Sequence, residues 1–352
     1  MAIATAASRR SALPALVTVA AALVAVAGCG ARSSPESRAS TRTSVSAPQP
    51  TGSSRPVAPP SPAPPPPASV HANELGQVPV LMFHDVVADP HGDYDISPDE
   101  LRAELTSLAE QGYVPVTMAD VAAGHIDIPA GTSPVVLTFD DSRRGQLTLD
   151  AAGNPTPTCA VGILQAVAAA HPGFPARASF YINRDAFGQS DPAPYLRWLA
   201  RHGYEVGDHT QTHADLRSLP PSGVVQEIGA VEATILAALG HGATTMALPY
   251  GAQPRPAPLA LDGGAGPQAY HFDAALLVGA NPAPSPFSTG WDPAAVPRLR
   301  VAHVHVEYDA AYWLPKIATT RYVSDGDPAH ISFPRNEMGR LSPAYRGEAQ
   351  PY

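Results

Sequence analysis

A long run of small residues and proline divides the sequence and limits where a hydrophobic core can form. From Ser33 to about Ser69 the chain is mostly Ser, Thr, Ala and Pro, and proline dominates residues 58–67. Such a segment has few apolar side chains to bury and favours extended polyproline II backbone. At about 3.1 Å per residue, roughly 40 residues reach on the order of 100 Å when fully extended. We therefore expect a disordered tether followed by a folded domain.

The residues before the tether have the pattern of an export signal. Arg9 and Arg10 precede an apolar run, residues 12–27, which is short for a bilayer span and typical of a signal peptide. The run ends in Val26-Ala27-Gly28-Cys29, which resembles the bacterial lipobox, in which the Cys is diacylated and becomes the first mature residue. This resemblance implies an exported protein anchored by lipid on Cys29 to the outer face of the bacterial cell membrane. The alternative is an ordinary secretory signal and a secreted protein.

These features predict three parts: a lipoprotein signal peptide over residues 1–28, a disordered linker over 29–74 and one domain over 75–352. The chain is 44% hydrophobic, enough for that domain to bury a substantial core. Its formal net charge is −9, and no basic cluster is longer than two arginines, which argues against nucleic acid as a partner. Its 2 Cys exclude a disulfide-stapled scaffold. The oligomeric state is not readable from these features.

Past Val78, buried apolar runs alternate with amphipathic stretches. This alternation predicts an α/β domain with parallel strands joined by helices. Strands are expected near residues 78–83, 114–117, 135–139, 178–182, 204–206 and 245–247, and helices near 98–111, 161–170, 194–201 and 224–239. The Pro- and Gly-rich stretch 252–286 is expected to be a surface excursion that forms part of the site wall, and residues 300–306 to form a strand.

Polar residues follow three of these strands directly. Asp140 and Asp141 come after the strand 135–139, and His209 and His213 follow the strand 204–206. A helical turn would point two histidines spaced four apart in the same direction. With one carboxylate, they make a three-ligand site that leaves positions open for water, as catalytic metal sites do. A His-x-x-x-His pair or an Asp-Asp pair alone is weak evidence for a metal site, because surface histidines and helix caps produce the same patterns.

Together the motifs resemble those of polysaccharide deacetylases, the carbohydrate esterase family 4 or NodB-like group. The resemblance rests on Thr138-Phe139-Asp140-Asp141, on His209-Thr210-x-x-His213 and on Leu248-Pro249-Tyr250-Gly251. It extends over residues 78–301 and includes Leu81-Met82-Phe83-His84-Asp85. The resemblance implies a distorted (β/α) barrel and metal-dependent removal of acetyl groups from sugars.

The same resemblance implies roles for individual residues. Asp140 matches the general base, and Asp141, His209 and His213 match the ligands of a divalent metal, most plausibly Zn²⁺. The backbone N–H of Tyr250 matches the group that stabilises the oxyanion, and Pro249 and Tyr250 are expected to line the substrate site. Trp291 is the best candidate for the family's aromatic pocket residue, although a Trp is more often a packing residue.

One residue departs from the family pattern, and the proton donor has two candidates. Ala247 stands where the third motif usually begins with an Arg that pairs with the base, so Arg298 or Arg300 would have to reach Asp140 from elsewhere. The family commonly supplies a proton to the leaving amine from a late His. His303 and His305 are the candidates, and alternating strand histidines without a chemical role are an equally plausible interpretation.

The sequence therefore predicts a hydrolase acting on carbon–nitrogen bonds other than peptide bonds, which removes acetyl groups, N-acetyl above all, from an envelope or extracellular polysaccharide. Two alternatives remain open. One is a non-catalytic glycan-binding lipoprotein on a deacetylase scaffold, motivated by Ala247 and by the late motifs that the sequence does not place. The other is an esterase acting on O-acetylated polysaccharide, which would use the same machinery.

Overall fold

The computed structural model describes residues 64–352, so the expected signal peptide, Cys29 and most of the linker lie outside the described part. The end of the linker expected at residue 74 is wrong. Residues 64–74 include the 3-10 helix η1 (Pro67–Val70), and Ala72 and Glu74 are buried. The Glu74 carboxylate accepts hydrogen bonds from Tyr322 Oη and the Ser332 amide, so this segment belongs to the domain.

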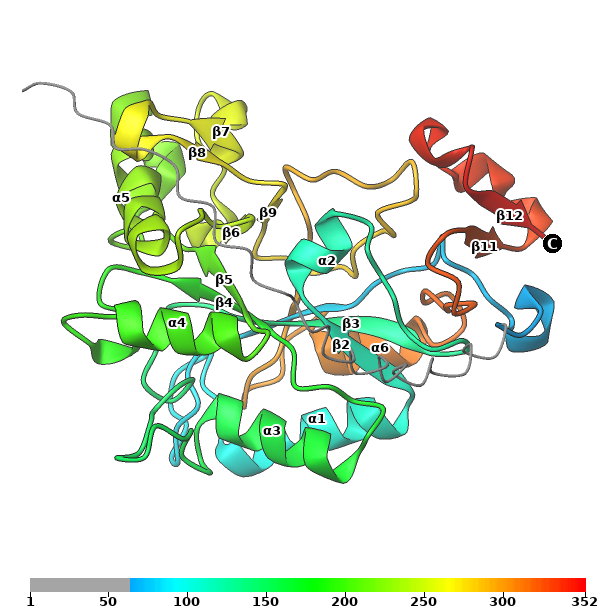
Figure 1. Ribbon diagram of the computed structural model, residues 1–352, viewed down its shortest axis with the longest axis horizontal. Coiled ribbons are helices and arrows are strands. Elements are labelled where there is room, and N and C mark those ends of the chain that lie inside the picture. The colour runs from blue at the N-terminus through cyan, green and yellow to red at the C-terminus, as the bar shows by residue number, and fades with distance from the viewer. Residues whose placement is uncertain (1–63) are drawn as a thin grey trace, which may run out of the picture. The chain divides into compact units, whose positions relative to one another are not determined.

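The centre of the domain is a sheet of eight parallel strands (Figure 1). Along the sheet the order is β10-β1-β3-β4-β5-β6-β9. Strand β2 pairs with the first half of β3, residues 133–136, whereas β4 pairs with its last residues, Thr138 and Phe139. The strands are β1 (Val80–Phe83), β2 (Tyr113–Val116), β3 (Ser133–Phe139), β4 (Ser179–Ile182), β5 (Glu205–Asp208), β6 (Thr245–Ala247), β9 (Ala274–Leu276) and β10 (Leu299–Arg300). All seven residues of β3 are buried, as expected for a parallel strand covered on both faces.

One short segment, residues 296–300, joins the two ends of this sheet. Val296 bridges Leu276 of β9, and three residues later Leu299 pairs with Leu81 of β1. Both pairings are parallel. The curled sheet is thereby closed into an irregular barrel, in agreement with the distorted (β/α) barrel that the sequence predicts.

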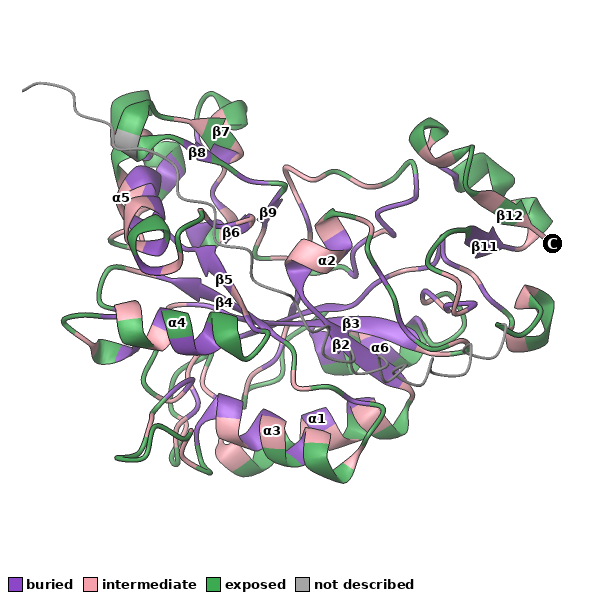
Figure 2. Ribbon diagram, in the orientation of Figure 1, coloured by how far each residue is buried: buried purple, intermediate pink, exposed green. Residues whose placement is uncertain are grey.

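Helices cover the outside of the barrel. They are α1 (Pro98–Glu110), α2 (Met118–Ala122), α3 (Ala160–Ala170), α4 (Ala193–Arg201), α5 (Pro221–Leu239) and α6 (Ala310–Lys316). In Figure 1, α1 and α3 lie side by side along one face of the sheet, and α4 lies along β4 and β5. Figure 2 shows the strands buried and these helices exposed on their outer sides. The start of α1 is fixed by a capping box between Ser97 and Glu100.

Helix α5 is long and apolar enough to cross a membrane by length and composition. Its apolar side chains are nevertheless used inside the domain, because Val224, Ile228, Val231 and Ile235 are all buried in the main hydrophobic core. We therefore interpret α5 as a core helix of the barrel.

The strands and helices expected before residue 250 are confirmed to within a few residues. The stretch 252–286 differs, because it contains β9, whose residues are completely buried in the sheet, as well as the small hairpin β7 (Asp262–Gly263) and β8 (Tyr270–His271). The strand expected over 300–306 is also wrong, because β10 ends at Arg300. Beyond the barrel, β11 (Ile331–Phe333) pairs with β12 (Ala349–Pro351).

Candidate active site

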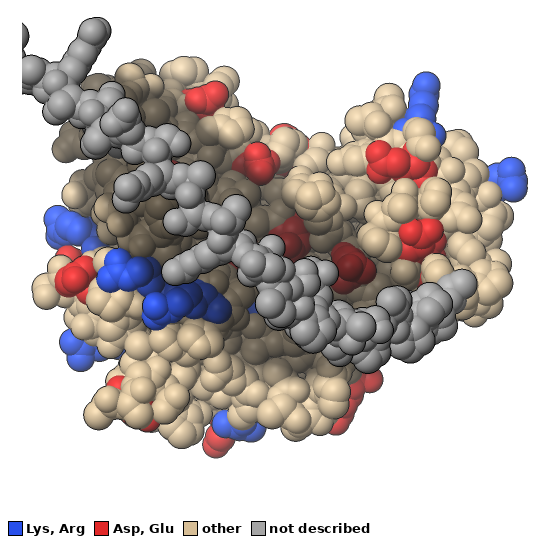
Figure 3. All heavy atoms as spheres, viewed as in Figure 1, with Lys and Arg blue, Asp and Glu red and all other residues tan. Residues whose placement is uncertain are grey.

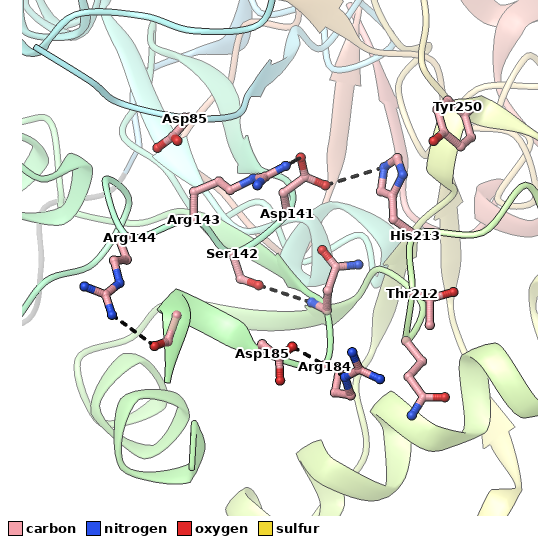
Figure 4. A pocket seen from close by; sticks show the side chains of 13 residues that line it. Asp85, Asp141, Ser142, Arg143, Arg144, Arg184, Asp185, Thr212, His213 and Tyr250 are labelled. Carbon is pink, nitrogen blue, oxygen red and sulfur yellow. Dashed lines mark hydrogen bonds and ion pairs between the residues drawn. The ribbon is translucent and has the colours of Figure 1, made fainter. Parts of the chain in front are cut away.

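Parallel strands bring several polar side chains to one rim of the barrel. Phe83 pairs with Phe139, so His84 after β1 lies beside Asp140 and Asp141 after β3. On the far side of β4, Ile182 pairs with Asp208, which places His209 in the same layer. In such folds, groups at the carboxyl ends of strands converge above the sheet. Asp141 from this rim lines a cavity of about 740 Å³ together with His213, Tyr250 and other residues (Figure 4).

Asp141, His209 and His213 point their ligand atoms at one another. Asp141 Oδ1 lies 3.4 Å from His209 Nε2 and 3.5 Å from His213 Nε2, and the three atoms lie within 4.8 Å of one another. Ligands bound tetrahedrally to Zn²⁺ at about 2.1 Å lie about 3.4 Å from each other. The two measured separations therefore match a zinc-sized coordination sphere.

The hydrogen bonding of His209 also fits a metal ligand. Its Nδ1 lies 2.7 Å from the carbonyl oxygen of Ala247, so Nδ1 carries the proton and Nε2 presents a lone pair. Nε2 is buried and makes no hydrogen bond. A buried polar atom without a partner is costly unless something absent from the protein chain satisfies it. The residues present therefore fit a divalent cation.

The backbone at this rim is strained. Asp141, Thr210, His213 and Tyr250 all have positive φ, between 58° and 69°, as does Ser142 at 46°. Each such non-glycine residue costs on the order of 1 kcal/mol, and clusters of them are typical of functional sites. The helical turn expected between His209 and His213 is wrong, because the left-handed residues Thr210 and His213 turn this segment into an irregular loop. The loop still brings the two imidazoles together.

Asp140 is held by a buried guanidinium. Arg298 donates hydrogen bonds of 2.8 Å and 2.7 Å to its two carboxylate oxygens, and both side chains are almost completely buried. The arginine also donates to the carbonyl oxygen of Leu277 and to Thr138 Oγ1. Burial alone would raise the pKa of Asp140, but Arg298, with His209 and His84, lowers it to about 2. Asp140 is therefore a carboxylate at any physiological pH.

His84 completes the inner group. Its Nε2 lies 3.9 Å from Asp140 Oδ2, and its ring stacks at 4.5 Å against the ring of Tyr94. Burial is the main reason why the pKa of His84 falls to about 4, with the neighbouring carboxylates opposing that shift. Its resting form is the neutral imidazole.

Comparison with known proteins agrees with this geometry. Residues 127–262, which include Asp140, Asp141, His209, His213 and Tyr250, match the family model for polysaccharide deacetylase. This part of the chain is therefore similar to polysaccharide deacetylases.

Solved structures of deacetylases share the fold. The deacetylase PplD of Streptococcus pyogenes, determined in complex with acetate, has a TM-score of 0.50 at 19% identity, over 64% of this chain and 92% of that one. BC0361, a polysaccharide deacetylase of Bacillus cereus, has a TM-score of 0.51 at 19% identity, over 69% of each chain. No curated protein matches this chain.

The arginine that is missing at position 247 is supplied by the segment that closes the barrel. Ala247 ends β6, whereas Arg298 lies between Val296 and β10 and reaches Asp140 from there. Of the two candidate arginines, Arg298 is the partner. Arg300 instead lies over the ring of Tyr94 and donates to the carbonyl oxygen of Val304. A glycine at 279 permits this close passage, because a Cβ there would overlap the backbone nitrogen of Arg298.

Three expected site residues lie elsewhere in the structure. Trp291 is half-buried, packs against a hydrophobic cluster that includes Leu276 and Phe287, and does not line the cavity. His303 pairs with Glu100 and His305 with Asp309, and neither lines the cavity. Both histidines follow the end of β10 at Arg300, and both of their side chains are exposed.

Tyr250 does line the cavity, with its ring 4.7 Å from that of His213, and Pro249 is buried directly behind it. The sequence contains His84 in the Leu81–Asp85 motif, yet spacing along the chain gives no sign that it lies beside Asp140. The parallel pairing of β1 with β3 is the signal that would have found it.

Proposed function

We propose that this polysaccharide deacetylase is a zinc-dependent N-deacetylase of an envelope or extracellular glycan. The observation that carries the proposal is the convergence of Asp141, His209 and His213 on one point, next to a carboxylate that Arg298 keeps ionised. A divalent cation held by these three side chains would activate a water molecule and polarise the acetyl carbonyl.

The protein's own groups would then move protons and stabilise charge. Asp140, off the metal and fixed by two hydrogen bonds from Arg298, is positioned to take the proton of the attacking water. The left-handed backbone of Tyr250 (φ 59°) turns that residue to the cavity, where its N–H would stabilise the oxyanion, as the family resemblance implies.

The leaving amine also needs a proton, and His84 is the best donor. The side chains of Arg298, His209 and His84 all lie within 4 Å of the Asp140 carboxylate. Arg298 does not release its proton in proteins, and His209 offers Nε2 to the metal. His84 Nε2, 3.9 Å from Asp140 Oδ2, is positioned to receive the proton that Asp140 takes from the water and to pass it to the leaving nitrogen.

The test is acetate release from chitooligosaccharide and peptidoglycan, with and without a chelator, together with metal analysis of the purified protein. We expect release that the chelator abolishes and that zinc restores. His213→Ala should lose bound metal, whereas Asp140→Asn should keep metal and lose turnover. His241→Ala, at an exposed histidine outside the cavity, is the matched control.

Failure to release acetate from any acetylated glycan would refute the proposal, and glycan binding without hydrolysis would favour the non-catalytic alternative. That alternative is motivated by Ala247 and by the unplaced late motifs, and the pairing of Arg298 with the base speaks against the first of these two motives. An O-acetylated xylan in the same assay would detect the esterase activity.

We also propose that the enzyme acts at the outer face of the cell membrane, held there by lipid on Cys29. The support is the sequence Val26-Ala27-Gly28-Cys29 followed by the proline-rich segment. Cys29→Ser should move the protein from the membrane fraction to the medium and stop incorporation of labelled fatty acid. Unchanged membrane association in this variant would contradict the anchor.

A further inference from the structure

The cavity at the active site has an arginine-rich wall that the hydrolysis reaction itself does not need. Arg143 and Arg144 come from the loop after β3, and Arg184 comes from the loop after β4. All three side chains are exposed, and Figure 4 shows them around the same cavity as Asp141 and His213. They cannot be explained by a basic surface, because the chain has 22 Lys and Arg against 31 Asp and Glu.

Figure 3 shows a face of the molecule on which charged side chains lie in small groups among uncharged ones. Against that background, three of the 13 residues that line the cavity are arginines. A concentration of guanidinium groups within one cavity is typical of recognition of carboxylate or phosphate.

The three arginines differ in how strongly carboxylates of the protein already pair with them. Arg143 lies 3.2 Å from Asp141 Oδ2 and also faces Asp85. The nearest carboxylate to Arg184 is Asp185 at 3.5 Å, and both of these side chains are more than half exposed. Such a pair contributes little in water, so Arg184 remains available to a ligand.

Arg144 has no carboxylate partner among the described residues. It donates one hydrogen bond of 3.3 Å to the carbonyl oxygen of Gly188. Gly188 has a φ of +66°, and a Cβ at this position would lie 2.5 Å from Arg144 Nε. The absence of a side chain at Gly188 therefore allows the Arg144 guanidinium to pack against the loop that carries Arg184.

The charge balance of the cavity depends on the metal. Without a cation, the arginines are matched by Asp85, Asp141 and Asp185. A divalent ion at Asp141, His209 and His213 adds two positive charges to this balance and leaves the cavity net positive. Low-dielectric walls focus such a field and favour an anionic ligand.

We infer that the substrate of this deacetylase is an acetylated glycan that carries negative charge close to the acetyl group, and that Arg144 and Arg184 form the subsite for its carboxylate or phosphate. This inference rests on the proposed function. It makes Arg144 and Arg184 specificity-determining residues, which hold the glycan without taking part in the bond-breaking step.

The test compares ligands that differ only in charge. One is an oligosaccharide of alternating N-acetylglucosamine and N-acetylmuramic acid, and its matched control is the same compound with the carboxylates converted to amides. N-acetylglucosamine 1-phosphate is the phosphate counterpart. Binding is measured by calorimetry on zinc-loaded protein that carries Asp140→Asn, which should keep the metal without turnover, so that the readout is independent of hydrolysis.

We expect the wild-type protein to bind the charged ligand at least about tenfold more tightly than the amide, since a charge-assisted hydrogen bond contributes about one factor of ten or more. Arg144→Gln with Arg184→Gln should abolish this preference without changing affinity for the amide. The ligand that loses more affinity in the double variant, the carboxylate or the phosphate, identifies the charged group of the substrate. Arg197→Gln, at an exposed position on α4 outside the cavity, should behave as wild type.

In steady-state assays the double variant should raise KM for the charged glycan and leave kcat and the neutral chitooligosaccharide unaffected. Equal affinity of the wild type for the charged and the amidated ligand would overturn the inference. So would a double variant that loses the same amount of affinity for each of the two ligands. Hydrolysis of neutral substrate is unaffected by either result. Failure of the subsite is therefore distinguishable from failure of the proposed function.

Discussion

Replacement of Arg298 by methionine should destabilise the domain more than almost any other single change. The substitution keeps an apolar stem of similar length but removes four donated hydrogen bonds, two of them to Asp140. Asp140 would be left as a carboxylate that is almost completely buried without a partner. Breaking a buried ion pair in this way costs about 3–5 kcal/mol, against a total stability of about 5–15 kcal/mol for a typical domain.

The assay is urea unfolding of wild type, Arg298→Met, Asp140→Asn and the double variant. If the cost arises from the uncompensated charge, the double variant should recover about 2 kcal/mol or more of the loss, because neither charge is then buried alone. Ala247→Arg in an Arg298→Ala background should restore part of the stability, since the family resemblance expects the base's partner at that position. Ala247 is completely buried, so a well-folded rescue requires the space that the Arg298 side chain vacates.

The same change should move the pH profile. Arg298 is the main group that holds the pKa of Asp140 at about 2, and without it burial raises that pKa. Because Asp140 acts as a base only when ionised, the acid limb of kcat/KM in Arg298→Lys or Arg298→Met should shift to higher pH. An Arg298→Met variant within about 1 kcal/mol of wild type, with an unchanged acid limb, would refute this reasoning.

Three further changes test other parts of the structure. His84→Gln should lower kcat by about a hundredfold or more with bound zinc unchanged, as expected for loss of a proton donor, whereas the exposed His91→Gln should have no effect; loss of zinc in His84→Gln would contradict this role. Burial raises the pKa of Glu74 to about 8 from an unfolded value of 4.5, so its stabilising effect is full below pH 4.5 and is lost as pH rises through about 8. Between about pH 5 and 9 the free energy of unfolding should fall by up to the order of 4 kcal/mol through this group, and Glu74→Gln should flatten the decline; an identical decline in the variant would exclude Glu74 as its source. Ser97→Ala removes the hydrogen bond to the Glu100 amide at the start of α1 and should cost about 1 kcal/mol in thermal or urea unfolding, and no change would mean that the capping box contributes nothing.

The parts of the fold that could be predicted are those with a strong local pattern. The strand Ser133–Phe139 and the helix Pro98–Glu110 have long apolar runs or a capping box, and both form where expected. By contrast, Ala274–Leu276 is three residues long and lies in a Pro- and Gly-rich stretch, and Leu299–Arg300 has only two residues. Such short strands exist because their neighbours in the barrel pair with them, and sequence periodicity does not record that.

In the candidate site, too, the residues that could be predicted are those next to a strong local pattern. Residues that directly follow well-marked strands, such as Asp140, Asp141 and His209, can be placed at one rim from the sequence alone. Arg298 lies 158 residues after the carboxylate that it pairs with, and no spacing in the sequence joins them. His303 and His305 are candidates by their position late in the chain, but the end of β10 at Arg300 sends them to other partners.

The closing segment at residues 296–300 sets a practical limit on how this protein can be divided. A fragment cut at the end of the family match, residue 262, would contain all three metal ligands and the base. It would lack the strands that complete the barrel and the only cation that donates hydrogen bonds to Asp140 among the described residues. Such a fragment would carry every recognised motif of a deacetylase and yet leave a bare negative charge in an open interior, so the smallest unit able to fold and work must extend beyond Arg300.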